Sequence, residues 1–161
     1  MNRIHVTDLY DNEEKYLVKL DDEILFNHKH VVKLNAYNNP RITSVDHMIK
    51  LKELNACFNC GIDDYNIKNN NLEKLDVFNN QKISDVNHMT NLKKLVANGI
   101  CGIGDNGVQK LNLEIIDTSQ NYEITNVNHM TNLRELSVCI NCGIDDYGIK
   151  NIGPGKNECI I

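Results

Sequence analysis

The stretch that decides the fold is ISDVNHMTNLKKL at residues 83–95, which returns almost unchanged as ITNVNHMTNLREL at residues 124–136. A degenerate copy, DHMIKL, precedes them at residues 46–51, and successive copies lie 41 residues apart. The triplet Cys-Gly-Ile recurs at the same interval, at residues 60–62, 101–103 and 142–144. Two motifs that share one period indicate an internal repeat, so we expect stacked copies of one small unit.

Each 41-residue period divides into half-units of 20 and 21 residues. The half-units are anchored by a leucine or isoleucine, at Leu34, Leu54, Leu75, Leu95, Ile116 and Leu136. A small or β-branched residue follows each anchor by two positions, and an isoleucine follows it by eight. Residues 31–152 therefore consist of six copies of L-x-x-L-x-A/V-x-x-N-x-x-I, in which Val31 stands for the first leading leucine.

This pattern predicts a solenoid with a parallel sheet. Alternating side chains around each anchor indicate a short strand with one face inward, and stacked strands lie about 4.8 Å apart. Segments such as residues 83–86 are too short for a regular α-helix, so we expect turns and 3₁₀ segments on the return side. A single half-unit cannot bury its apolar face alone, so stacking stabilises the fold.

An asparagine stands five positions after most anchors. A buried side-chain amide there can bond backbone groups left unpaired where the chain turns. The predicted asparagine ladder comprises Asn39, Asn59, Asn80, Asn121 and Asn141. Ile100 replaces the asparagine in the fourth repeat, which leaves the geometry of that turn open.

The repeated residues 83–95 and 124–136 resemble the leucine-rich-repeat family, in its short-repeat, internalin-like or SDS22-like branch. The resemblance covers residues 31–152. It implies an α/β solenoid bent into an arc, with the parallel β-sheet on the concave side and the turns on the convex side. It also implies a non-enzymatic module that binds another protein. The abundance of asparagine in these repeats is similar to that of repeat proteins from large amoeba-infecting viruses, which would place the protein in host cytoplasm or a virion.

The two ends of the solenoid need covering, because a terminal repeat exposes a sheet edge and an open core. We expect residues 1–30 to form an N-terminal cap with a short helix, capped by Asp11 or Asn12. The alternative is an irregular strand from Tyr16 to Leu20. The C-terminal tail, residues 153–161, is short and contains glycine and proline. We therefore hypothesise that a second copy or a partner covers the last repeat, which would give a homodimer.

Composition limits the possible partners and compartments. The net charge of −5 and the lack of a basic stripe argue against nucleic-acid binding. No apolar run reaches membrane-spanning length, so no membrane association is expected. No N-terminal basic and apolar stretch indicates a secretory signal, which favours an intracellular, reducing compartment.

Two Cys-x-x-Cys pairs, Cys57/Cys60 and Cys139/Cys142, suggest a zinc or redox site. The repeat register argues against it, because the pairs lie four repeats apart, roughly 19 Å along the stack. Cys60 and Cys142 are expected to point inward, and Cys57 and Cys139 toward the concave face. We interpret them as small structural residues and predict no metal and no cofactor.

Other polar repeats also have structural interpretations. His47, His88 and His129 recur every 41 residues, about 10 Å apart in the stack, so they are expected to bond backbone groups of the convex side. Asp63–Asp64 and Asp145–Asp146 are interpreted as turn caps, with a weak calcium site as the alternative. No nucleophile–base arrangement or phosphate loop is visible, so we expect no enzyme.

The concave face is the predicted site, because its outward positions vary between repeats. Phe58 and Phe78 are aromatic at positions expected to be exposed, as interface anchors often are. The candidate binding residues are Asn35, Tyr37, Asn55, Phe58, Asp76, Phe78 and Asp117. The alternative is that loops or the N-terminal cap cover these rings. The leading function is an interaction scaffold for an unknown protein partner. The second is a self-associating structural protein that uses its C-terminal edge.

Overall fold

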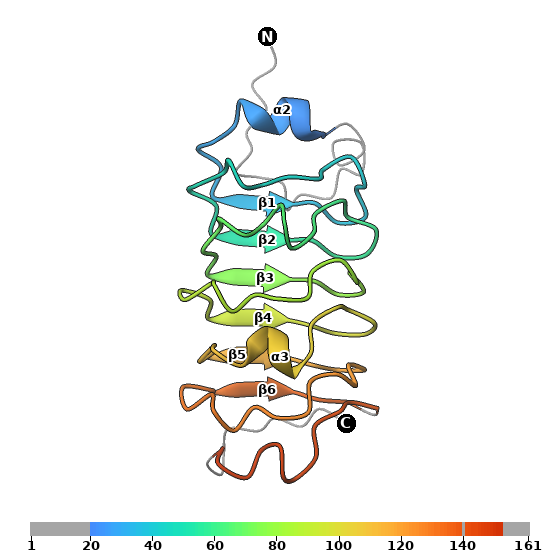
Figure 1. Ribbon diagram of the computed structural model, residues 1–161, viewed down its shortest axis with the longest axis vertical. Helices are drawn as coiled ribbons and strands as arrows, with labels where there is room; N and C mark the ends of the chain where they lie inside the picture. The colour runs from blue at the N-terminus through green and yellow to red at the C-terminus, as the bar shows by residue number, and fades with distance from the viewer. Residues whose placement is uncertain (1–19, 140, 153–161) are drawn as a thin grey trace.

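The computed structural model describes residues 20–139 and 141–152, which form a parallel β-solenoid. Six three-residue strands stack in chain order in one sheet (Figure 1). They are β1 (Lys33–Asn35), β2 (Glu53–Asn55), β3 (Lys74–Asp76), β4 (Lys94–Val96), β5 (Ile115–Asp117) and β6 (Glu135–Ser137). Each pairs in parallel with the next, and the six predicted anchors align in register. We call a strand with the return segment after it a coil, numbered 1–6 by its strand.

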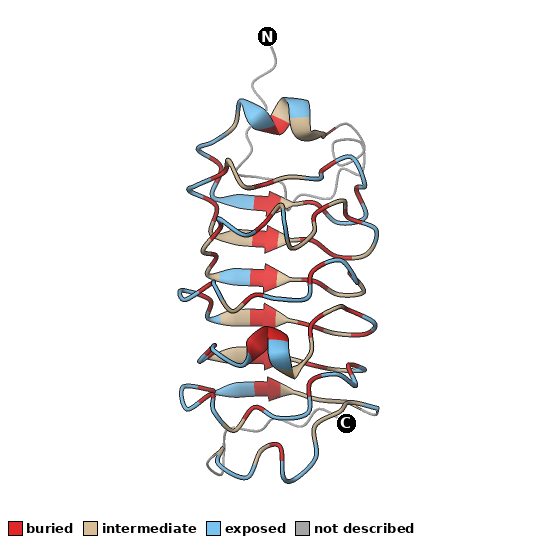
Figure 2. Ribbon diagram, viewed as in Figure 1, coloured by how far each residue is buried: buried red, intermediate tan, exposed pale blue. Residues whose placement is uncertain are grey.

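The strands are short because only their central residue faces the core. Every anchor is buried, and the two residues beside it are half-buried or exposed. Figure 2 shows this as a line of buried positions running down the middle of the sheet. The alternation is what a sheet with one solvated face requires. The period-two pattern therefore predicted the strands correctly.

One continuous apolar core runs through the stack. The isoleucine that follows each anchor by eight positions is fully buried in coils 1–5 (Ile42 to Ile124). In coil 6 the equivalent Ile144 is only half-buried. Stacking therefore completes the core of each inner coil with side chains from its neighbours.

The described return segments form the predicted turns but not the predicted 3₁₀ segments. The Met89 N–H donates to the Val86 carbonyl oxygen at 3.0 Å, and the Leu92 N–H donates to that of Met89 at 2.9 Å. A 3₁₀ helix needs such i→i+3 bonds at consecutive residues, whereas these lie three residues apart. The described helices are α2 (Asp22–Phe26) and α3 (Asp105–Val108), each about one turn long. The prediction of 3₁₀ segments was therefore wrong for the described return segments.

Helix α2 lies at the N-terminal end of the stack and occupies the same place in the repeat as α3 (Figure 1). Asp22 accepts hydrogen bonds from Thr43 as Asp105 does from Thr125. Residues 20–30 therefore continue the solenoid as one return segment. The α2 N-cap is Asp21, whose Oδ1 accepts from the Ile24 N–H at 3.1 Å. The predicted caps Asp11 and Asn12, the alternative strand up to residue 19 and the tail 153–161 lie outside the described residues.

The asparagine ladder is shorter than predicted. Asn39, Asn80 and Asn121 are buried, and their amides donate to backbone carbonyl oxygens of Leu20, Ala56 and Ala97 respectively. Asn59 and Asn141 are instead exposed. In coils 2 and 4 the chain turns inward one residue later, so Cys60 and Cys101 take the buried position. The ladder thus belongs to the odd coils. Ile100, 70% exposed, occupies the same outer position as Asn59 and leaves the turn regular.

Both helices are far too short to span a bilayer, and the described residues contain no apolar helix long enough to do so.

Candidate protein-binding face

The outer face of the sheet begins with a row formed by the first residue of each strand, which is charged in every strand except β5, where it is Ile115. Glu53 on β2 lies 3.1 Å from the ammonium groups of both Lys33 on β1 and Lys74 on β3. Burial acts to raise the pKa of the Glu53 carboxyl, but hydrogen bonds and charge from the two lysines outweigh it and hold this pKa below its ordinary value. On the first three strands this row therefore forms an ion-pair network centred on Glu53.

The second row contains four of the predicted binding residues, and it ends the strands. Asn35, Asn55, Asp76 and Asp117 each accept a hydrogen bond from the backbone N–H two residues later, at 3.0–3.1 Å. Such Asx turns let a side-chain oxygen replace the next ladder bond where the chain leaves the sheet. Their side chains remain half-exposed. These four residues therefore have a structural task whether or not they contact a partner.

Two residues of the third row, Tyr37 and Phe78, and the residue that follows this row in coil 2, Phe58, bring the three predicted aromatic rings together, and we call them the aromatic ridge. The Tyr37 and Phe58 ring centroids lie 5.1 Å apart, and those of Phe58 and Phe78 lie 4.9 Å apart. Both pairs are edge-to-face, the arrangement that aromatic quadrupoles favour. Tyr37 is 42% exposed, and the two phenylalanine rings are half-buried. The ridge thus remains open to solvent, and described loops do not bury it.

Phe58 reaches its place through an unusual backbone. The residue four positions after the anchor has positive φ in coils 1–5: Asn38, Phe58, Asn79, Gly99 and Gln120. Asparagine and glycine adopt this left-handed region at little cost, whereas a bulky aromatic residue there is an outlier. Phe58, with φ of 57°, is strained by about 1 kcal/mol on general grounds. This strain sets the Phe58 ring between its two aromatic neighbours.

Cys57 stands between Tyr37 and Phe78 in the same row, but it is buried. Its thiol donates to Asp76 Oδ1 at 2.9 Å. Burial, together with the hydrogen bond and the negative charge of Asp76, raises the Cys57 pKa far above its ordinary value. Burial likewise raises the pKa of Cys60 to about 11. Both thiols stay protonated at neutral pH, which disfavours nucleophilic chemistry.

The ridge ends where β4 begins the second half of the face. A Cβ atom at Gly99 would lie 3.0 Å from Phe78 Cε2 and 2.3 Å from Asn79 Oδ1, so the glycine leaves room for the last ring of the ridge. Beyond it the same row carries Asn98 and Ser119, which both donate to the Asp117 carboxylate. In this row the outer face therefore has an aromatic half over β1–β3 and a polar half at β4 and β5, whereas Val96 and Ile115 are apolar in the other two rows. Asp117 belongs to the second half, away from the other candidates.

The repeated polar residues of the return side bond backbone groups, as predicted. The Nε2 atoms of His47, His88 and His129 contact the carbonyl oxygens of Leu25, Ile67 and Val108 at 3.1–3.3 Å. Asp64 accepts from the backbone N–H and the hydroxyl of Ser84, at 2.7 and 2.6 Å. Within residues 20–139 and 141–152, no three histidine, cysteine, aspartate or glutamate side chains gather as metal ligands would.

One exposed apolar place was not singled out from the sequence. It surrounds Phe26 and Ile49 at the opposite ends of the first strands from the ridge. The available signal was the repeat itself: Ile49 and Lys50 stand where the later periods have Thr90-Asn91 and Thr131-Asn132. Comparison of the sequence with models of protein families and with curated proteins gave no match.

Proposed function

We propose that the protein is a non-enzymatic scaffold of the leucine-rich-repeat kind, internalin-like or SDS22-like, which binds a partner protein through the outer face of its sheet. That face would be the concave side of a leucine-rich-repeat arc. The observation that carries the proposal is the aromatic ridge, whose three rings touch edge-to-face and stay partly exposed. The proposed compartment is intracellular and reducing. The free thiols of Cys57, Cys60 and Cys101 are consistent with such a compartment.

The ridge has the properties of an interface centre. A few residues supply most of the binding free energy at protein interfaces, and aromatic side chains are enriched at interface centres, inside a polar rim. Here the rim is the Lys33–Glu53–Lys74 network. Edge-to-face packing holds the rings in place, so little side-chain entropy is lost on binding. The strained φ of Phe58 is an outlier of the kind that clusters at functional sites.

The charges on this face favour a protein partner. Glu53, Asp76 and Asp117 lie among the lysines, and the whole chain carries a formal charge of −5. A nucleic acid needs a continuous basic surface to replace its counterions. A protein surface with one or two apolar side chains and mixed charges matches the ridge and its rim.

The test is Phe58→Asn, which installs the residue that coils 1 and 3 carry at the same position, Asn38 and Asn79. Asparagine tolerates positive φ, so relief of about 1 kcal/mol of strain offsets part of the lost ring packing and the variant should still fold while losing the central ring. We expect immobilised wild-type protein to capture a defined partner from cell extract and Phe58→Asn to lose it. The matched control is Gln120→Asn, which installs the same residue at the equivalent turn in the polar half. Capture that survives Phe58→Asn would contradict the proposal.

A second candidate function is self-association through the C-terminal end, as in a structural assembly protein. The observation in its favour is that Ile144 and Ile149 of coil 6 are half-buried, whereas their equivalents Ile62 and Ile67 are fully buried. A second copy that covered coil 6 would complete their burial. The mass measured by light scattering over a wide concentration range under reducing conditions tests this, and a monomer at every concentration would exclude it.

A further inference from the structure

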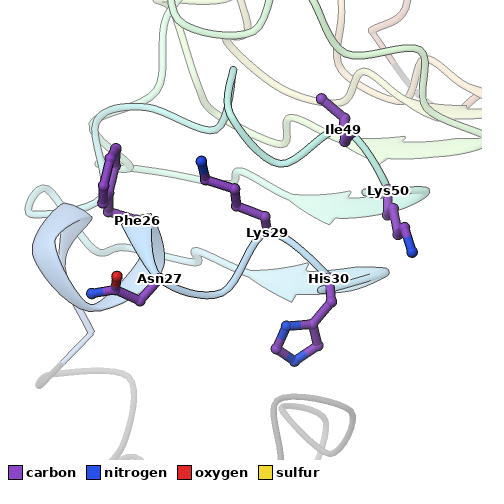
Figure 3. Close-up of a pocket in the computed structure, with 6 residues that line it drawn as sticks. All are labelled: Phe26, Asn27, Lys29, His30, Ile49 and Lys50. Atoms are coloured by element: carbon purple, nitrogen blue, oxygen red, sulfur yellow. The ribbon is translucent and has the colours of Figure 1, made fainter.

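A shallow hollow lies between α2 and the return segment of coil 1, at the N-terminal ends of β1 and β2. It has a volume of about 420 Å³ and is lined by Phe26, Asn27, Lys29, His30, Ile49 and Lys50 (Figure 3). The aromatic ridge lies where the strands end, so the two places are separate. The hollow therefore needs an explanation of its own.

The lining combines exposed apolar groups with bases. Phe26 is 59% exposed and Ile49 is 80% exposed, so both present apolar surface to solvent. The Lys29 ammonium lies 5.2 Å from the centroid of the Phe26 ring, and the His47 ring packs on that ring at 5.8 Å. His30 and Lys50 are exposed beside them. In a chain of net charge −5, this gathering of bases around apolar surface is a local exception.

The repeat shows that the fold does not require these residues. In coils 2 and 3 the Asn71 amide donates to Thr90 Oγ1 at 3.1 Å, and its oxygen accepts from the Asn91 N–H at 2.9 Å. We call this pair of hydrogen bonds a clasp, and the next period forms it with Asn112, Thr131 and Asn132. In the first period the three equivalent positions carry His30, Ile49 and Lys50. A structural polar clasp has thus been replaced by an apolar side chain and two bases.

We infer that this hollow binds a short acidic peptide segment that carries a bulky apolar side chain. The apolar side chain would lie on Phe26 and Ile49, where it removes their exposed surface from water. Carboxylates beside it would pair with Lys29 and Lys50, which stand at the rim of the apolar surface. A ligand that contacted only the apolar groups, or only the bases, would leave the other part of the lining without a role. A polyanion such as nucleic acid would leave Ile49 unused and would meet the negative charge of the rest of the chain.

The variant that tests this is the repair of the clasp, His30→Asn with Ile49→Thr and Lys50→Asn. These are the residues that the later periods use, so the variant should fold with unchanged or higher thermal stability. The probe is a fluorescein-labelled peptide of sequence DELFDE, titrated with the full chain and followed by fluorescence anisotropy. We expect saturable binding of the wild type and at least a tenfold weaker affinity for the repaired variant, about 1.4 kcal/mol.

Two further measurements separate the components of the site. A peptide NQLFNQ without charges and a peptide DESSDE without apolar side chains should each bind at least fivefold more weakly. Phe58→Asn should bind DELFDE as the wild type does, so failure here and failure of the ridge proposal are distinguishable. The inference is overturned if DELFDE does not bind saturably, if the repaired variant binds it equally, or if either control peptide binds as tightly.

Discussion

The odd and even coils leave the sheet at the same place, and we call the turn there the exit of the coil. Different side chains stabilise this turn in the odd and the even coils. In coil 3 the buried amide of Asn80 donates to the Ala56 carbonyl oxygen at 2.7 Å, and its oxygen accepts from the Lys82 N–H at 2.8 Å. In coil 4 the equivalent buried residue is Cys101, whose thiol lies 3.4 Å from the Ala97 carbonyl oxygen. A thiol is a weak donor and packs as a small apolar group. The odd exits are therefore held by hydrogen bonds and the even exits by packing.

The glycine that follows Cys101, and likewise Cys60 and Cys142, links each even coil to the odd coil before it. The N–H of Gly102 donates to the backbone carbonyl oxygen of Asn80 at 3.0 Å, and Gly61 and Gly143 do the same toward Asn39 and Asn121. A Cβ atom at Gly102 would lie 2.7 Å from the Ile83 carbonyl oxygen, so only glycine allows this approach. The backbone of an even coil thus completes the exit of the odd coil before it. The structural unit is the 41-residue pair of coils.

The largest expected effect is that of Asn80→Ala, which removes the amide from an odd exit. It leaves the fully buried Ala56 carbonyl oxygen and the Lys82 N–H without these partners. The unsatisfied buried carbonyl costs about 1–3 kcal/mol and the lost bond to the exposed Lys82 about 1 kcal/mol, so we expect the free energy of unfolding to fall by about 3 kcal/mol. Urea denaturation followed by circular dichroism measures this. A loss below about 1 kcal/mol would mean that water replaces the amide and that the odd exits are not held by it.

The strands and the core were predictable from the sequence because they depend on side-chain polarity at a fixed period. Leu34 to Leu136 and the isoleucines that follow them occupy equivalent places, so packing repeats what the sequence repeats. The inward turn was not predictable for Asn59, because the residue four positions after the anchor has positive φ in odd and even coils alike, as at Asn38 and Phe58, and does not mark the shift of one residue that follows it. A single amino-acid pattern fits both registers.

The candidate site was predictable in part. Tyr37, Phe58 and Phe78 were found because aromatic residues stood at outward positions, and the structure brings their rings together. The choice of the Asn35-to-Asp117 row stays a prediction, because asparagine and aspartate oxygens make the same Asx turn, so the structural role alone accounts for these residue types. The hollow at Ile49 was missed because the three positions that break the repeat become neighbours only when two coils stack.

Thr118→Val should act in the opposite direction and with a smaller effect. Thr118 occupies the inward position where coil 3 has Val77, and its buried hydroxyl has no hydrogen-bond partner. Valine has nearly the same shape, so the substitution removes a desolvated polar atom and should raise the free energy of unfolding by about 1 kcal/mol. Thermal and urea unfolding both measure it. The matched control is Thr125→Val, which should destabilise, because the Thr125 hydroxyl donates to Asp105 Oδ2 at 2.6 Å. If Thr118→Val lowered the free energy of unfolding as much as Thr125→Val does, the Thr118 hydroxyl would have to have a hydrogen-bond partner.

The smallest expected effect, and the one that sharpens the comparison most, is that of Asn59→Ala. Asn59 stands five positions after its anchor, as Asn80 does, so a uniform ladder predicts equal losses for both substitutions. The structure places Asn59 on the surface of an even exit whose inward position belongs to Cys60. An exposed substitution of this kind changes stability by about 0.5 kcal/mol or less. Urea denaturation of Asn59→Ala and Asn80→Ala under identical conditions therefore decides between a repeat of single coils and one of paired coils. Equal losses would support the single coil, whereas a difference of about 2.5 kcal/mol would show that hydrogen bonds hold alternate exits only.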